Sequence, residues 1–102
     1  MNKILLFKNQ PEGEYNLSFK IVTEQKTCKL QINDTEKRIE LSDEKTEENT
    51  YVDEYTGEEI HETIIYKEYS TVLYLTSVNE VYLHINNYDV IYDLNIELIQ
   101  DE

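Results

Sequence analysis

Apolar and polar residues alternate at every second position along much of this chain, and that period is typical of β-strands that bury one face. The alternation is clear at residues 15–21. It returns at 28–33 and again at 39–41, after Asp34-Thr35-Glu36, so these two segments predict a β-hairpin. The acidic stretch 42–49 has no apolar side to bury, and we expect a loop or a short helix there.

A second hairpin is predicted from segments 51–55 and 60–69, which flank Thr56-Gly57-Glu58. Glycine adopts a positive φ without steric cost, so the turn is expected at this point. Strands are also predicted at 71–76, 81–85 and 90–100, with turns at 77–80 and 86–87. Because 90–100 has the longest alternation in the chain, we expect it to be a central strand.

The composition favours the same fold class. The chain has eleven Ile, six Val and nine Tyr but no Ala, and β-branched and aromatic side chains pack well on a pleated sheet. The sequence predicts an all-β protein, a small antiparallel sandwich or barrel of eight to nine short strands. The alternative is an α+β fold with an antiparallel sheet packed on one helix from the C-terminal third, where apolar residues also fall at helical spacing. With 102 residues, we expect a single domain over 1–102.

Charge is distributed unevenly along the chain. The formal net charge is −13, with 22 acidic and 9 basic side chains. Residues 1–33 carry +2, residues 34–68 carry −9 and residues 69–102 carry −6, and within 43–62 nine carboxylates face a single lysine. Binding to a nucleic-acid backbone needs cations, so no direct nucleic-acid partner is expected. A basic protein is the better candidate partner.

Residues that could carry chemistry are few. Cys28, His61 and His84 allow a cysteine–histidine nucleophile or a metal site in principle. However, Cys28 alternates in phase with Leu30 and Ile32, which predicts a core residue, and His61-Glu62 lacks the second histidine of a zinc-protease helix. We therefore expect no catalytic residues, no metal and no cofactor. Most of the nine tyrosines are expected to fill the core, and the alternative for four of them, Tyr51, Tyr55, Tyr66 and Tyr69, is an exposed position among the carboxylates of the second hairpin, as in protein interfaces.

The sequence shows no pattern typical of a signal peptide or a membrane span. The N-terminal apolar run is short, a single cysteine forms no internal disulfide, and no apolar run approaches the ~18 residues of a membrane span. These features predict a cytoplasmic protein with no membrane role.

Together these observations predict a non-enzymatic binding protein that inhibits a nucleic-acid-handling protein, such as a nuclease, by placing carboxylates where phosphates would bind. In composition alone, the chain is similar to phage inhibitors of bacterial defence nucleases, including anti-restriction and anti-CRISPR proteins, and to immunity proteins. The alternatives are a structural or assembly β-domain that self-associates, a homodimer among its forms, and a small hydrolase or metal-binding enzyme. The expected partner-binding residues are Asp43, Glu44, Glu47, Glu48, Tyr51, Asp53, Glu54, Tyr55, Glu58, Glu59 and Glu62.

Overall fold

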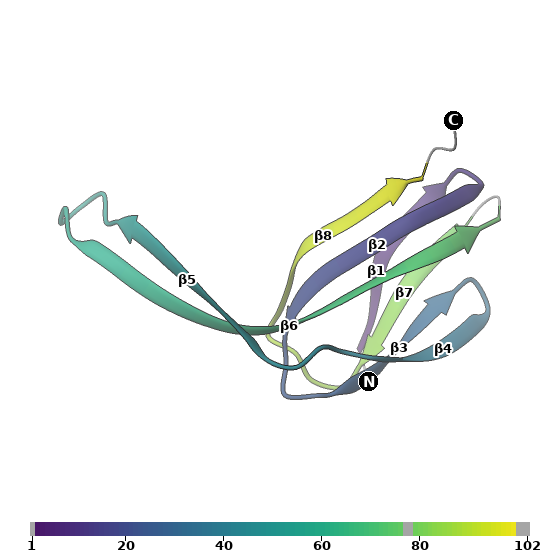
Figure 1. Ribbon diagram of the computed structural model, residues 1–102, viewed down its shortest axis with the longest axis horizontal. Coiled ribbons are helices and arrows are strands. Elements are labelled where there is room, and N and C mark those ends of the chain that lie inside the picture. Colours follow the sequence, from purple (N-terminus) through teal and green to yellow (C-terminus); the bar gives the residue numbers. More distant parts are fainter. Residues whose placement is uncertain (1, 77–78, 100–102) are drawn as a thin grey trace.

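The computed structural model describes residues 2–76 and 79–99, and the chain forms eight β-strands there with no helix (Figure 1). The strands are β1 (Asn2–Gln10), β2 (Gly13–Val22), β3 (Thr27–Ile32), β4 (Thr35–Glu40), β5 (Lys45–Val52), β6 (Glu59–Leu75), β7 (Asn79–Ile85) and β8 (Val90–Leu98). None of the described residues forms a helix that could cross a membrane.

The strands form two four-stranded antiparallel sheets, with the orders β1-β7-β3-β4 and β5-β6-β2-β8. Their inner faces pack together around one cluster of buried apolar side chains. The all-β prediction is therefore confirmed as a small sandwich, and the α+β alternative is not favoured. The helical spacing in the C-terminal third misled because period two and period 3.6 coincide at a few positions of any apolar-rich segment.

The core uses the alternation that the sequence displays. Along β2, Tyr15, Leu17, Phe19 and Ile21 are each at most 3% exposed, and the residues between them point outward. Leu83 on β7 is fully buried opposite them. Cys28 belongs to the same cluster, as predicted from its phase.

Several local predictions were wrong. The acidic stretch 42–49 is mostly strand β5, because a strand that pairs with β6 and keeps both faces in water needs no apolar side. The two predicted strands at 60–69 and 71–76 are one continuous strand, β6. The turn predicted at 77–80 includes Asn79 and Glu80, which belong to β7. Strand β8 lies at a sheet edge and not at the centre. Residues 77, 78 and 100 of these predictions lie outside the described residues.

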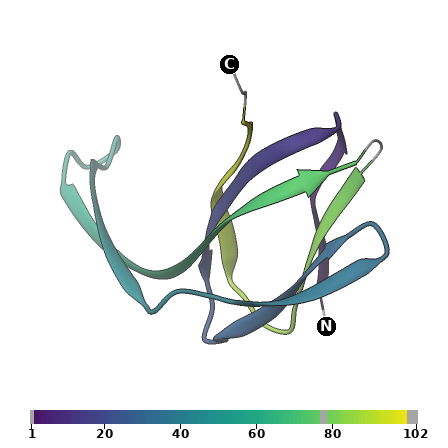
Figure 2. The same ribbon diagram turned by 45° about the vertical axis from the view of Figure 1, so that its right-hand side comes forward.

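One part of the chain leaves the sandwich. Strand β6 pairs with β2 from Lys67 onward, whereas residues 59–66 pair only with β5. We call residues 45–66 the hairpin arm; it extends the β5-β6-β2-β8 sheet outward and projects far from the rest of the molecule (Figures 1 and 2). The radius of gyration is 16.4 Å, against about 13 Å for a compact domain of this length. The molecule is therefore a sandwich body with one long arm.

Candidate functional site: the acidic hairpin arm

The hairpin arm contains nine of the eleven residues that the sequence suggested for partner binding; Asp43 and Glu44 lie in the loop just before it. The arm holds seven carboxylates and one lysine, so its formal charge is −6 with His61 neutral. All of its residues are exposed or half-buried. The structure thus gathers most of the predicted residues on one element, although they do not share a single face.

The register of the arm spreads its carboxylates over both faces. Cross-strand partners lie on the same side of a ribbon, and no carboxylate of β5 or β6 is paired with another: Glu47 faces Ile64, Glu48 faces Thr63, Glu62 faces Asn49 and Glu59 faces Val52. Like charges directly opposite one another destabilise a strand pair. This staggering lets a two-stranded ribbon carry a high negative charge and still form.

Local hydrogen bonds shape the tip of the arm. The Asp53 carboxylate accepts a hydrogen bond from the Tyr55 amide at 2.8 Å, and the Gly57 amide donates to the Asp53 carbonyl at 2.8 Å. Gly57 has φ 73°, a conformation that a residue with a Cβ adopts only with strain. Asp53 is therefore a turn-forming residue, whereas the Tyr55 side chain beside it is 97% exposed.

Lys20 links the hairpin arm to the body where the arm leaves the sheet, a place that we call the root of the arm; we call Lys20 the brace. Lys20, on β2, lies 3.1 Å from a carboxylate oxygen of Asp93 on β8 and 3.7 Å from one of Glu47 on the arm. Its ammonium also lies 5.0 Å from the ring centre of Tyr66 and 5.8 Å from that of Tyr92. Asp93 reaches this position from a bulge in β8, where its own φ is 50°.

The surroundings of Lys20 raise two pKa values, that of Lys20 itself and that of Tyr92. The hydrogen bond to Asp93 is the main cause of a raised pKa for Lys20, and Glu47 acts in the same direction. Burial, followed by the nearby Glu47 carboxylate, raises the pKa of Tyr92. Glu47 thus shares Lys20 with Asp93, and this contact makes Glu47 a positioning residue for the arm.

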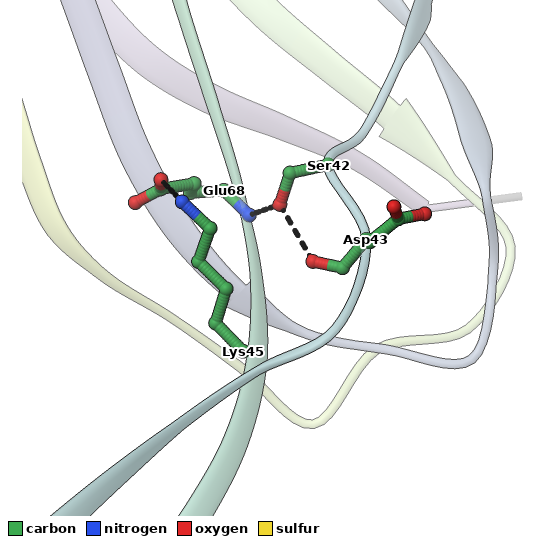
Figure 3. Close-up of polar contacts among 4 residues, drawn as sticks. All are labelled: Ser42, Asp43, Lys45 and Glu68. Atoms are coloured by element: carbon green, nitrogen blue, oxygen red, sulfur yellow. Dashed lines mark hydrogen bonds and ion pairs between the residues drawn. The ribbon is translucent and has the colours of Figure 1, made fainter.

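A second anchor lies where the chain passes from β4 to β5 (Figure 3). Lys45 pairs with the Glu68 carboxylate, and this contact is the main cause of a raised pKa for Lys45. The Glu68 amide donates to the Ser42 hydroxyl at 2.8 Å, and the Ser42 amide donates to the Glu68 carbonyl at 2.9 Å. Lys67, next to Glu68, is buried and donates to the Gln25 carbonyl at 2.7 Å. The root is therefore held at two places, by Lys20 and by the contacts around Glu68.

Beyond the root, the charge of the arm is left to solvent. Among the described residues, the side chains of Glu48, Glu54 and Glu58 make no hydrogen bond or ion pair. Glu62 accepts a hydrogen bond from the Tyr51 hydroxyl at 3.4 Å, and Glu59 lies 4.0 Å from His61. Tyr51 and Val52 are 46% and 63% exposed. The outer arm therefore presents carboxylates interspersed with apolar side chains.

Cys28 and His84, two of the residues weighed for catalysis, line one hollow, but in the described part of the chain no hydrogen bond joins Cys28 to either histidine. Cys28 is buried in the core, and burial raises the pKa of its thiol to about 11, so the nucleophilic thiolate is scarce at neutral pH. His84 lies on the opposite face of the same sheet, and His61 is on the arm. The described residues contain no group of three or more His, Cys, Asp or Glu side chains placed to hold a metal.

Sequence reasoning missed the residues that position the arm. Lys20, Tyr66, Tyr92 and Asp93 come from three strands, and only the register between β6, β2 and β8 brings them together. The expectation that most tyrosines fill the core was also wrong, because Tyr15 is the one buried tyrosine and only Tyr69 and Tyr88 pack against the cluster as partly buried residues. Alternation fixes which residues share a side of a strand, but not whether that side is covered.

Comparisons with known proteins add no assignment. No family model matches the sequence, and no curated protein or solved structure matches it significantly. The function must therefore be argued from the geometry of the arm.

Proposed function

We propose that this chain is a non-enzymatic binding protein whose acidic hairpin arm occupies the basic groove of a nucleic-acid-handling protein, such as a nuclease, and excludes the nucleic acid from it. The observation that supports this most is the arm itself, a ribbon with net charge −6 that projects from the body with both faces in water. An inhibitor of a defence nuclease or an immunity protein against a nuclease toxin would work in this way.

The charge spacing of the arm supports phosphate mimicry. The eight residues of β5 span about 27 Å at the ~3.4 Å rise of an antiparallel strand. Apart from Glu47, which pairs with Lys20, six carboxylates lie along the two faces and the tip of the arm, and over roughly this length they amount to about one charge per 4–5 Å, against ~3.4 Å per phosphate along one strand of duplex DNA. A groove that encloses the arm from both faces would meet a charge density comparable to that of a single nucleic-acid strand.

The apolar side chains of the arm would then determine how long the complex lasts. Exposed carboxylates accelerate encounter with a basic surface and set its orientation. Burying Tyr51, Val52 and the fully projecting Tyr55 in the groove removes apolar area from water, and this slows dissociation. The fixed root helps as well, because an arm that is already positioned loses less conformational entropy on binding.

The test is displacement of a labelled single-stranded oligonucleotide from a panel of purified nucleases and other nucleic-acid-binding enzymes with basic grooves. We expect the protein to displace the oligonucleotide from at least one enzyme at concentrations where poly-L-glutamate of equal total charge does not. Raising the salt from about 0.05 M to about 0.5 M should slow association several-fold, because the screening length falls to a few ångströms.

Two matched charge-reversal variants test whether the arm is the part of the protein that displaces the oligonucleotide. Glu54→Lys, Glu58→Lys and Glu59→Lys together reverse the tip, and we expect them to abolish displacement. The control reverses three exposed carboxylates of the body, Glu14→Lys, Glu24→Lys and Glu97→Lys, and should leave displacement near the wild-type level. Displacement from no enzyme of the panel, or equal losses in the two variants, would count against the proposal.

A further inference from the structure

Four basic residues form a row across the outer face of the β1-β7-β3-β4 sheet. Arg38 on β4 is the register partner of Lys29 on β3, Lys29 is the partner of His84 on β7, and His84 is the partner of Lys3 on β1. We call Arg38, Lys29, His84 and Lys3 the cation row. With strands ~4.8 Å apart, the row is about 14 Å long. The row is a basic surface in a chain whose net charge is −13, whereas the hairpin arm is its acidic surface.

The cation row is only partly neutralised within the chain. Glu36 lies 3.8 Å from Lys29 and 3.9 Å from His84. Lys3 rests over the ring of Tyr82, and in the described part of the chain neither Lys3 nor Arg38 forms an ion pair. Basic residues directly opposite one another destabilise a sheet. An anion bound across the row would remove this repulsion.

A hollow lies along the row. Its volume is about 220 Å³, and it is lined by three residues of the row, Lys29, Arg38 and His84, and by Gln25, Thr27, Cys28, Ile85 and Asn86. All of these side chains except Cys28 and Ile85 are good hydrogen-bond donors. Glu36 and Glu40 lie two residues to either side of Arg38 on the same face of β4, and Glu36 is the one that pairs with Lys29, so the cations of the row without an ion pair in the described part of the chain are Arg38 and Lys3. The hollow suits a carboxylate carried on a flexible side chain.

We propose that the cation row is the docking site for the tip of the hairpin arm of a second copy of this chain. The tip offers three exposed carboxylates, Glu54, Glu58 and Glu59, where the row offers three permanent cations. A molecule cannot make this contact with itself, because its arm leaves from the other sheet and ends on the far side of the molecule (Figures 1 and 2). The contact is therefore head-to-tail and joins copies into open chains.

The association should be strongest at intermediate salt concentration. A narrow tip on a short row buries less than a standard interface, so the contact is weak. At very low salt the net charge of −13 makes whole molecules repel each other. At about 0.15 M the screening length of ~8 Å leaves mainly the local contact, and at about 1 M the length of ~3 Å weakens that contact too.

The experiment measures the weight-average mass by sedimentation velocity between about 10 µM and about 1 mM protein, in about 0.15 M salt. We expect the mass to rise with concentration for the wild type. It should stay monomeric for the row variant, Lys29→Glu with Arg38→Glu, and for the tip variant, Glu54→Lys with Glu58→Lys and Glu59→Lys. Mixing the two variants should restore a pair, because the Glu residues of one then meet the Lys residues of the other.

The matched control is Lys37→Glu. Lys37 lies on β4 next to Arg38 but pairs with the buried Leu30, on the other side of the sheet, and we expect it to associate like the wild type. A constant wild-type mass, a loss of association in Lys37→Glu, or no pairing in the mixture would overturn the proposal. Saturable binding of tripolyphosphate to the row in a protein that stays monomeric would overturn it too. The row variant should still displace the oligonucleotide, so this inference and the proposed function fail independently.

Discussion

The sandwich body and the hairpin arm are built from the same alternating sequence but use it differently. Strand β6 runs through both regions: in the body, Leu73 and Leu75 are buried while Val72 and Tyr74 are exposed, whereas no residue between 59 and 66 is buried. The body is held together by apolar burial. The arm depends on strand hydrogen bonds and on its fixed root, and its side chains remain available to another molecule.

Truncation of one apolar side chain in each region should give the largest contrast. Phe19 is 1% exposed in the body and packs beside Tyr69, so Phe19→Ala should lower the free energy of unfolding by about 3–5 kcal/mol. Ile65 on the arm is 53% exposed, and Ile65→Ala should cost about 1 kcal/mol or less. Urea denaturation followed by circular dichroism measures both. Equal costs would mean that the arm is packed like the body.

A backbone change at the tip should destabilise the protein less, and only locally. Gly57→Val places a β-branched side chain at φ 73°, and the strain should destabilise the turn by about 1–2 kcal/mol. Amide hydrogen exchange should then accelerate at residues 50–60 and remain unchanged in β2 and β7. Accelerated exchange throughout the body would show that the two regions unfold as one unit.

Removing the brace should loosen the arm without unfolding the body. In Lys20→Met, Glu47 and Asp93 lose their shared cation, so the arm should move more freely about its root. A fluorescent label on a Tyr55→Cys variant reports this as lower steady-state anisotropy, and buried Cys28 stays unlabelled. Lys8→Met, a change of the same charge on β1, is the control. An unchanged anisotropy would exclude Lys20 as the brace.

Alkaline pH should loosen the arm in the same way. The folded protein holds the protons of Lys20 and Tyr92 more tightly than the unfolded chain, where the ordinary pKa values are 10.5 and 10.0. The stabilisation is fully present below about pH 10 and is lost as the pH rises through the raised values. The anisotropy of the Tyr55→Cys label should fall only above about pH 10, with a smaller change in Lys20→Met. A fall between pH 6 and 9 would contradict this assignment.

The body could be predicted from the sequence to a large extent, but the arm only partly. The alternation at 15–21 identified a strand and its buried side because burial and period coincide there. At 42–49 the same reasoning failed, since an exposed strand needs no apolar period. The charge count located the acidic cluster, yet its division over two faces, the Lys20 brace and the cation row all depend on strand register, which local patterns do not fix.

The most direct test removes the arm altogether. Lys45 and Tyr66 are cross-strand partners, so replacing residues 46–65 with Asn-Gly closes a two-residue hairpin at the root. In the oligonucleotide-displacement assay, this shortened protein should keep the β-sheet spectrum of the wild type and lose all displacement. Undiminished displacement by the folded body alone would contradict the claim that the arm is the recognition element.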